Sequence, residues 1–339
     1  MSAPPLRVLQ SFTPDRGDVS VNPYTSLLER SLRPRCEVHR FTWPRALAGR
    51  YDVLHCHWPE HLIGNRQWLR RTVAQVLFAL LLVVVRVRRI AVVQTIHNVE
   101  PHAVPSRISA ALLRRLDTIV GDRIYLHDTR DTDPRSRAHV FPHGDYDDWY
   151  AERPRVPAQP GRLVHFGRVH RYKNVDGLLR AVAESPDAAL RLVVAGSVVD
   201  GELERELRAL AAADPRVDLR LEPVPDDELS RIVTSAEAVV LPYEYLYNSG
   251  SLLLALTLGR PVVVPRSELG DGLADEVGHD WVATYDPPLD GQTLRAALNN
   301  LRAAAQKRGD RPDFVDRDWD AQAERLVSVY RDAVAARRG

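Results

Sequence analysis

Cysteine is scarce in this sequence, and neither sign of charge is in excess. Cys36 and Cys56 are the only cysteines among 339 residues, so we expect no framework of disulfide bonds and a reducing, cytoplasmic location. Lysine and arginine together number 46 and aspartate and glutamate 45, which gives a formal net charge of +1. Domains that bind nucleic acid are usually strongly basic, so this balance argues against nucleic acid as a partner.

A long apolar run is also missing. The longest, at residues 73–85, is interrupted by Gln75 and is shorter than the about 20 apolar residues that a membrane-spanning helix needs. We therefore expect a helix that packs on a sheet. The alternative is a basic, apolar element that rests on an anionic membrane surface, such as the inner face of the cell membrane, because arginines flank the run on both sides. The start of the sequence shows no secretory leader pattern.

Short β-rich runs alternate with longer helical patterns along the chain. Strands are expected at residues 6–11, 36–42, 52–56, 90–96, 123–126, 138–141, 163–167, 190–196, 217–221, 238–242 and 261–265. Helices are expected at residues 23–32, 67–87, 106–116, 175–184, 202–213, 226–234, 251–258, 294–307 and 320–335. Strands separated by helices indicate crossover connections and parallel sheets, so the fold class is α/β.

A polar, proline-rich stretch divides this pattern. Residues 151–161 contain three prolines and end in a glycine, and proline blocks both helices and central strands. We expect a linker here, between an N-terminal domain at residues 1–152 and a C-terminal domain at residues 153–318. Each half is predicted to be a doubly wound, Rossmann-like unit that binds ligands at the carboxyl ends of its strands.

A pattern suited to phosphate binding opens the second half. Gly167 ends a strand, which lets a ligand approach the backbone closely, and Arg168 and Lys173 place two cations before the next helix. Backbone N–H groups, a helix N-terminus and two cations together suit a diphosphate. The alternative is a pair of solvated surface cations, which is common for arginine and lysine.

A second helix start of this kind follows the strand at residues 238–242. Asn248 and Ser249 are residue types that cap helix N-termini, and Gly250 exposes backbone N–H groups. Three tyrosines occur within residues 243–247. They could line a sugar or base pocket, or they could pack within the loop, because tyrosine suits half-buried positions.

These segments and several others, in the same order, resemble the glycosyltransferases of the GT4 type (group 1), which have the GT-B fold. The segments are residues 51–59, 95–98, 141–144, 166–168, 172–174, 248–251 and 258–263. The resemblance implies two Rossmann-like domains with a cleft between them. It also implies transfer of a sugar from a nucleoside-diphosphate sugar, UDP- or GDP-linked, to a glycan, lipid-linked or small-molecule acceptor, as in polysaccharide biosynthesis.

The resemblance further implies roles for individual residues. The catalytic residues would be His97, near the transferred sugar, with Arg168 and Lys173, which would hold the donor diphosphate. The donor-binding residues would also include Gly167, Val224, Tyr247, Asn248, Ser249, Gly250 and Ser251. The residues on the acceptor side and in the first loop would be Asp15, Gly17, Asp18 and His57. The C-terminal helix, at residues 319–337, would pack back on the first domain.

No cofactor and no metal are expected, because the two cations can neutralise the departing phosphate by themselves. His55 and His57 share one face of a strand, so a metal pair is conceivable, but structural zinc needs four ligands and no second pair with ligand spacing occurs. Contact with the acceptor and simple packing are the other interpretations of His57. The same two alternatives apply to His102 and His143.

The sequence departs from the GT4 pattern at one motif. Retaining members carry two glutamates with seven residues between them, and the matching positions here are Leu246 and Leu254. The second glutamate normally binds the ribose hydroxyls, so that contact is in doubt, with Glu244 as a displaced substitute. Retention of configuration stays favoured for this hexosyltransferase. An inverting enzyme would need a general base, and the candidates by position are Asp15, Asp18, Glu60 and His97.

Two alternative functions remain. The missing glutamates allow a non-catalytic protein that binds nucleotide sugars. Two Rossmann-like units would also suit a nicotinamide-dependent oxidoreductase, but the Gly-x-Gly-x-x-Gly turn expected after the first strand is absent, since residues 11–17 stand there instead.

Overall fold

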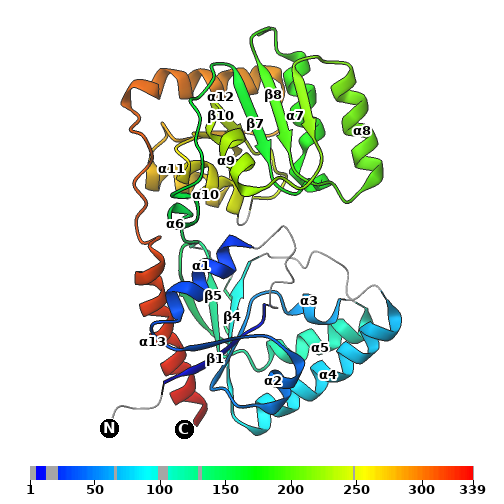
Figure 1. Cartoon of the computed structure of the whole chain (residues 1–339), viewed down its shortest axis with the longest axis vertical. Helices are drawn as coiled ribbons and strands as arrows, with labels where there is room; N and C mark the ends of the chain where they lie inside the picture. The colour runs from blue at the N-terminus through cyan, green and yellow to red at the C-terminus, as the bar shows by residue number, and fades with distance from the viewer. Residues whose placement is uncertain are drawn as a thin grey trace. The chain divides into compact units, whose positions relative to one another are not determined.

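The computed structural model describes residues 5–12, 22–64, 67–97, 106–128, 132–246 and 249–338. The chain forms two compact units (Figure 1). Unit 1 contains residues 1–144 and 316–339, and unit 2 contains residues 145–315. The chain thus enters unit 2 before Asp145, rather than after Glu152 as expected, and the C-terminal helix belongs to unit 1.

Unit 1 is built on a six-stranded parallel sheet with the strand order β2-β1-β3-β4-β5-β6. Its strands are β1 (Arg7–Gln10), β2 (Glu37–Arg40), β3 (Val53–Cys56), β4 (Ala91–Ile96), β5 (Asp122–Tyr125) and β6 (Arg137–Val140). After β2 the chain crosses to the other side of β1, so a switch point lies between β1 and β3. Open α/β sheets bind ligands at such a point, outside the carboxyl ends of the strands.

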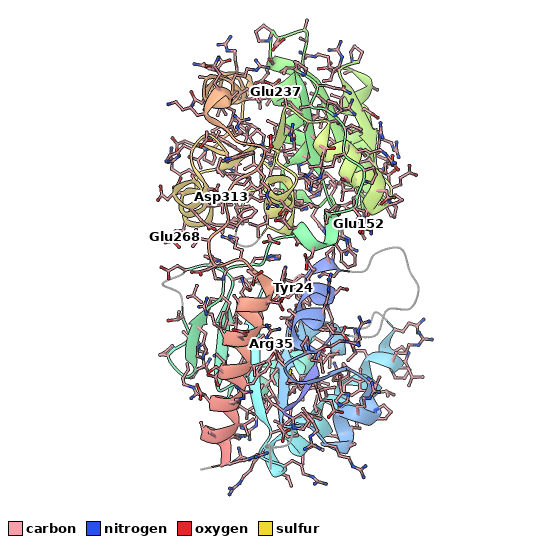
Figure 2. All side chains as sticks on the ribbon, turned by 60° about the vertical axis from the view of Figure 1, so that its left-hand side comes forward. Tyr24, Arg35, Glu152, Glu237, Glu268 and Asp313 are labelled. Atoms are coloured by element: carbon pink, nitrogen blue, oxygen red, sulfur yellow. The ribbon has the colours of Figure 1, made fainter. Side chains whose placement is uncertain are left out.

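The helices of unit 1 form two groups. They are α1 (Pro23–Leu32), α2 (Trp43–Ala48), α3 (Pro59–Ile63), α4 (Trp68–Val87), α5 (Arg107–Asp117) and α13 (Trp319–Arg338). Helix α13 packs against α1, β3 and β4, whereas α2, α3 and α5 pack around α4. Arg35, labelled in Figure 2, ties the segment after α1 to α13 through Asp320 at 2.9 Å and Glu324 at 3.1 Å.

Alternation along the strands directs neighbouring side chains to opposite faces of this sheet. Leu9 is in register with Leu54, and both join a buried apolar cluster that includes side chains of α4. The next row contains Gln10 in register with His55. This row faces α13, where the Tyr330 hydroxyl lies within hydrogen-bonding distance of both side chains.

Unit 2 repeats the design with the strand order β12-β11-β10-β7-β8-β9, again all parallel. Its strands are β7 (Arg162–Phe166), β8 (Arg191–Ala195), β9 (Val217–Arg220), β10 (Ala238–Val240), β11 (Val262–Pro265) and β12 (Val282–Tyr285). From the middle of the sheet, β7, β8 and β9 follow one another toward one edge, and β10, β11 and β12 follow one another toward the other edge. The switch point of this sheet therefore lies between β7 and β10.

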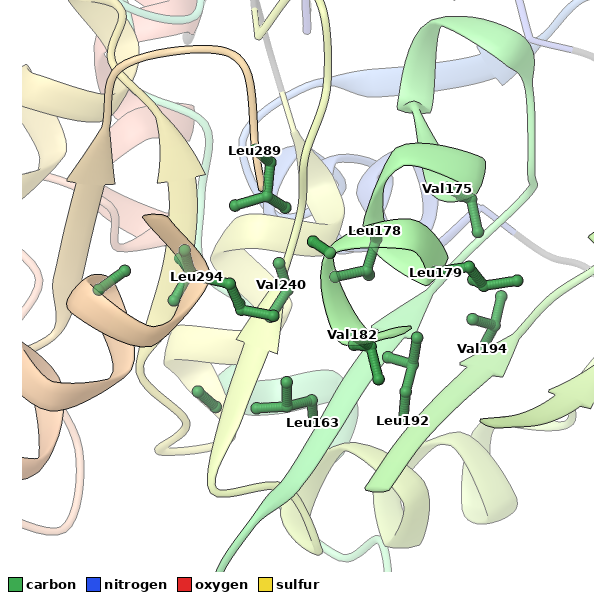
Figure 3. Close-up of a cluster of buried hydrophobic side chains, with 14 of the residues drawn as sticks. Leu163, Val175, Leu178, Leu179, Val182, Leu192, Val194, Val240, Leu289 and Leu294 are labelled. Carbon is green, nitrogen blue, oxygen red and sulfur yellow. The ribbon is translucent and has the colours of Figure 1, made fainter. Parts of the chain in front are cut away.

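Helices and one large apolar core complete unit 2. The helices are α6 (Asp147–Tyr150), η1 (Arg171–Lys173), α7 (Val175–Glu184), α8 (Gly201–Ala212), α9 (Asp226–Thr234), α10 (Gly250–Thr257), α11 (Glu268–Val277), α12 (Gly291–Ala304) and η2 (Ala305–Lys307). Helix α7 packs against α8 and α12. Figure 3 shows Leu178 and Val182 of α7 in the same cluster as Leu192 and Val194 of β8, and all four are at most 2% exposed.

The proline-rich stretch that we expected to be a linker lies within unit 2. The N–H of Val156 donates to Oγ1 of Thr234 at 3.0 Å, and the N–H of Gln159 donates to the Ser235 carbonyl at 2.9 Å. These two N–H groups, which lie between the prolines, take part in no helix or strand. They connect the segment to the end of α9 instead.

The apolar run at residues 73–85 lies within α4, which nearly coincides with the helix expected at residues 67–87. Helix α4 has 20 residues, and by length and composition alone it could cross a membrane, whereas the apolar run within it is shorter. The helix is also only partly buried, because Val76 and Val83 are 55% and 57% exposed.

Candidate functional site

Features that suit a phosphate group converge at the switch point of unit 2. Gly167 directly follows β7 and has a φ of +96°, a conformation that favours glycine. A Cβ atom added there would lie 3.0 Å from Oγ of Ser251 and 3.4 Å from Nζ of Lys173. The backbone of Gly167, the Ser251 hydroxyl and the Lys173 ammonium group are thus close together. We refer to Gly167, Lys173 and Ser251 as the phosphate cradle.

The position of Lys173 is set by a tight turn. This residue ends η1, and its N–H donates to the His170 carbonyl at 3.0 Å. Its side chain is buried, and Nζ lies 4.9 Å from the centre of the Tyr243 ring, which is the geometry of a cation–π contact. Within the part of the chain that the structure describes, no carboxylate pairs with this ammonium group. Its charge is therefore available to a bound anion.

The start of α10 completes the cradle. Ser249 is the N-cap, and its Oγ accepts a hydrogen bond from the N–H of Leu252 at 3.1 Å. The N–H groups of the first turn, including those of Gly250 and Ser251, have no intrahelical partner. With the helix dipole they favour an anion at this end. A Cβ atom at Gly250 would come within 2.7 Å of the Tyr146 hydroxyl, so this position has no room for a side chain.

The other predicted donor-binding residues differ in their placement. Arg168 follows Gly167 and is exposed. Val224 is half-buried in the loop after β9, at the same edge of the parallel sheet as the phosphate cradle. Tyr247 and Asn248 lie outside the described residues.

The two positions that would carry glutamates hold buried leucines. Leu246 is 9% exposed and Leu254 is 7% exposed, so each packs as an apolar residue. Glu244, considered as a substitute, is exposed, and its N–H donates to the Tyr172 carbonyl at 2.8 Å. That bond joins the loop after β10 to η1 and so to the phosphate cradle.

A fully buried histidine lies behind the cradle and was not predicted. Nδ1 of His165 is 3.0 Å from the Val240 carbonyl, so Nδ1 carries the proton and donates. Among the described residues, Nε2 of His165 has no hydrogen-bond partner. Burial, with the nearby charge of Lys173, lowers the pKa of His165 to about 3. The imidazole is therefore neutral at physiological pH and adds no charge beside the lysine.

Histidines occupy the switch point of unit 1. Nε2 of His57 lies 2.8 Å from Oε1 of Gln10, and Nδ1 of His57 lies 3.2 Å from Nε2 of His97. An amide oxygen only accepts, so Nε2 of His57 donates to it and Nδ1 of the neutral ring accepts. His97 therefore donates from Nε2 to His57.

His55 continues this network toward the C-terminal helix. Nε2 of Gln10 donates to the Tyr330 hydroxyl oxygen at 3.3 Å. The hydroxyl proton of Tyr330 is then directed to Nδ1 of His55, 2.6 Å away. The proton on Nε2 of His55 points to Oγ1 of Thr95 at 2.8 Å. Each ring nitrogen of His55 thus has a partner, which fixes its tautomer.

Burial keeps these histidines neutral. It lowers the pKa of His57 to about 3 and that of His143 to about 4. Burial and the neighbouring imidazoles lower the pKa of His55 and of His97 well below the ordinary value. A neutral imidazole can accept a proton at the ring nitrogen that carries none. In His97 that nitrogen is Nδ1, because Nε2 donates to His57.

Aromatic rings enclose His97. The ring of Trp58 is stacked on it with the ring centres 4.0 Å apart, and Tyr24 meets it edge-on at 4.9 Å. Tyr24, labelled in Figure 2, also contacts His143 at 5.0 Å and Trp319 at 5.3 Å. These contacts fix the imidazole at the carboxyl end of β4.

Only part of this cluster was predicted from the sequence. Asp15, Gly17, Asp18 and His102 lie outside the described residues. Glu60 is half-buried in the first turn of α3. Gln10, Tyr24, Thr95 and Tyr330 were missed, although Gln10 and Thr95 are polar residues in buried strands, which is an unusual position that could have marked them.

The described histidines at this switch point are joined to one another and to neighbouring side chains by hydrogen bonds. His55 and His57 share a face of β3, with ring centres 4.2 Å apart, but their nitrogens are engaged in the hydrogen bonds described above. In the described parts of the chain, no group of three or more His, Cys, Asp or Glu side chains could hold a metal ion. Metal independence of the protein stays a prediction.

Solved structures with the same architecture identify the class of protein. HepE of Anabaena, solved with UDP and glucose, superposes with a TM-score of 0.63 at 14% identity over 97% of this chain and 99% of that chain. WaaG, a glycosyltransferase involved in lipopolysaccharide biosynthesis, gives 0.58 at 16% identity over 95% and 99%. Two six-stranded parallel sheets with flanking helices define this chain as a protein of the GT-B fold.

Sequence comparisons identify the family. The family model of the glycosyl transferases group 1 matches residues 160–302. The GDP-mannose:glycolipid 4-beta-D-mannosyltransferase of Xanthomonas campestris pv. campestris is 35% identical over 333 residues, which cover 98% of this chain and 94% of that protein. A D-inositol 3-phosphate glycosyltransferase of Corynebacterium aurimucosum is 24% identical over 361 residues, covering 94% and 81%.

The chain therefore belongs to the group 1 glycosyltransferases. This confirms the resemblance seen in the sequence and replaces the alternative of a nicotinamide-dependent oxidoreductase.

Proposed function

We propose that this glycosyltransferase moves mannose from GDP-mannose to a lipid-linked glycan, with inversion at the anomeric carbon and without a metal ion. The similarity to the Xanthomonas mannosyltransferase carries the proposal, because it extends over 98% of this chain at 35% identity. That span includes both units, so it supports a shared donor and a shared class of acceptor.

The phosphate cradle would do the work of a metal ion. Cleavage of the bond between sugar and phosphate leaves negative charge on the departing GDP, and positive charge develops on the anomeric carbon. Lys173, the N–H groups at the start of α10 and the neighbouring Arg168 would stabilise that negative charge. Such groups are fixed before the reaction, so they need no reorganisation in the transition state.

Two observations support inversion rather than the retention that the resemblance favoured. GDP-mannose carries its sugar in α linkage, so a β-mannoside, the product that the relative's name states, requires inversion. Leucines also stand at 246 and 254, where retaining relatives carry glutamates. Inversion needs a base for the acceptor hydroxyl. We assign that role to His97, which burial keeps neutral.

The donor is tested first by thermal shift. The full chain is heated with GDP, UDP, ADP, dTDP or NAD, once in EDTA and once with magnesium, since a ligand that binds only the folded state must raise the Tm. We expect the largest shift with GDP. A larger shift with UDP would overturn the choice of base, and a shift that requires magnesium would overturn metal independence.

Transfer and stereochemistry are tested in a second experiment. GDP-mannose is incubated in EDTA with dodecyl glycosides as mimics of a glycolipid acceptor, and the mannoside formed is examined by NMR for its one-bond carbon–proton coupling at the anomeric carbon. A β-mannoside supports inversion, and an α-mannoside contradicts it. Binding of GDP without release of GDP from any acceptor would favour the non-catalytic nucleotide-sugar-binding protein.

A further inference from the structure

Helix α4 presents a continuous apolar stripe to solvent. Six residues spaced three or four apart are about half exposed or more: Leu69 60%, Val73 52%, Val76 55%, Leu80 48%, Val83 57% and Val87 74%. At 3.6 residues per turn this spacing keeps them on one side of the helix over about 27 Å. Trp68, which is 69% exposed, is the seventh exposed apolar residue and lies at the N-terminal end of α4. We call these seven residues the apolar stripe.

The opposite side of α4 is committed to unit 1. Phe78, Leu81 and Val85 are at most 1% exposed and belong to the core cluster that contains strand residues of β1, β3 and β4. Insertion of α4 across a bilayer would strip this cluster of its helix. The geometry therefore suits a helix that lies along a surface, with one face in the protein and the other in its partner.

The charged side chains within residues 67–90 are all positive. Residues 67–90 contain five arginines, at positions 70, 71, 86, 88 and 89, and no acidic residue. None of these arginines has an ion-pair partner among the residues that the structure describes. Helix α5 lies alongside, with Ser109 Oγ 2.8 Å from Nε2 of Gln75, and its first turn adds the exposed Arg107 and Ile108.

These charges distinguish between the two occupants that could cover the stripe. In a two-fold dimer the same surface of each copy forms the interface. The arginines of residues 67–90, which contain no acidic residue, would then face the arginines of the second copy or lose water without gaining an acidic partner. Either outcome disfavours a dimer. Anionic lipid head groups offer the opposite charge, and a bilayer interface accepts valine, leucine and tryptophan side chains.

We propose that α4 docks unit 1 on an anionic lipid bilayer, with the apolar stripe in the interface and the flanking arginines on lipid phosphates. This role is separate from the chemistry of transfer, and it would hold the enzyme at the surface where a lipid-linked acceptor resides. Vesicle binding needs neither donor nor acceptor, so its failure would leave the proposed transfer reaction untouched.

The test is flotation of the full chain with vesicles of phosphatidylglycerol and phosphatidylethanolamine, or of phosphatidylcholine alone. We expect binding to the anionic vesicles and little to the neutral ones. V76D/V83D should abolish binding, and V199D, which changes a 64% exposed valine of unit 2, should not.

R70A/R86A/R88A should weaken binding by about fivefold for each arginine at low salt, while R205A/R231A/R295A, with the same charge loss in unit 2, should bind as the wild type.

A fluorophore on Val83→Cys provides a readout that tolerates failure of the Asp variants to fold. Cys36 and Cys56 are buried, so the new thiol is the accessible one. A blue shift on addition of anionic vesicles supports docking of the stripe. The proposal is overturned if the wild-type protein does not bind anionic vesicles. It is also overturned if the emission wavelength of the fluorophore stays the same in vesicle-bound protein. A dimer that V76D/V83D dissociates would assign the stripe to a second copy and overturn it as well.

Discussion

The Tyr330 hydroxyl lies 2.6 Å from Nδ1 of His55, which joins the C-terminal helix to the switch point of the first sheet. Both residues are fully buried, at 0% exposure. The same hydroxyl accepts a hydrogen bond from Gln10, which in turn holds His57. A residue near the end of the chain therefore fixes the tautomers of a cluster that belongs to the first strands.

Tyr330→Phe should destabilise the protein without a large change of shape. Removal of the hydroxyl leaves Nδ1 of His55 and the Gln10 amide without their buried partner, and such a loss costs about 1–3 kcal/mol. Urea denaturation of the wild type and the variant measures the difference in the free energy of unfolding. Tyr245→Phe is the matched control, because Tyr245 is 77% exposed. Equal stabilities of Y330F and wild type would contradict the hydrogen-bond network.

Buried neutral histidines should make the protein less stable in mild acid. His57, His143 and His165 have a pKa of about 3, about 4 and about 3 in the folded protein, against 6.5 for an ordinary histidine. As the pH falls below 6.5, the unfolded chain takes up protons that the folded chain does not. Unfolding is thereby favoured, by up to about 1.4 kcal/mol per pH unit for each histidine.

The free energy of unfolding should therefore be level above about pH 7 and fall steadily between about pH 6.5 and about pH 4. Urea denaturation across this range measures the slope. His143→Asn keeps a donor near the Gly144 carbonyl, which Nδ1 of His143 contacts at 2.8 Å, but removes one titrating group. Its slope should be smaller by about one proton, and a slope equal to that of the wild type would show that His143 titrates normally.

Lys173→Ala should lower turnover while leaving the fold intact. The ammonium group belongs to the phosphate cradle and lies over the Tyr243 ring, so its loss removes charge that the leaving GDP would need. By analogy with loss of an oxyanion-hole donor, we expect kcat to fall by about 100-fold to 1,000-fold. Steady-state release of GDP from GDP-mannose measures the effect.

Lys307→Ala provides the control, because Lys173 and Lys307 are the only two lysines in the chain and Lys307 is exposed at the end of η2. It should turn over as the wild type does. If K173A kept the wild-type rate, Lys173 would have no part in the reaction.

The meeting of Gly167, Lys173 and Ser251 at one edge of the second sheet was predictable because its signals are local. Gly167 at a strand end, Lys173 before a helix and Ser249 at an N-cap each occur within a short segment whose strand or helix the apolar pattern predicts. Parallel strands then bring such segments to one edge of a sheet. The same locality explains why α7 was predicted with the observed bounds, Val175–Glu184.

The histidine network was not predictable, because its partners are distant in the chain. Gln10 and Tyr330 are 320 positions apart, and neither shows in its own segment that it meets the other. Helix α11 was missed for a different reason, since Gly270 and Gly272 lower the helix propensity of its middle. The four-residue strand β12 that follows it was too short to stand out.

Gly250→Ala tests whether the first residue of α10 must lack a side chain. The added Cβ would lie 2.7 Å from the Tyr146 hydroxyl, so either the tyrosine or the helix start must move, at about 1–3 kcal/mol for such overpacking. If the helix start moves, its N–H groups leave the phosphate cradle, and the thermal shift with GDP should shrink together with the stability.

Tyr146→Phe removes the oxygen atom that the new methyl group would strike. Combined with Gly250→Ala, it should restore most of the stability and of the GDP-dependent shift, relative to Y146F alone. This rescue separates a steric clash from loss of backbone freedom, since glycine is not required here for its φ angle. If G250A lost GDP binding and Y146F/G250A did not recover it, the clash would not be the cause, and the glycine would instead be needed for direct approach of the phosphate to the helix start.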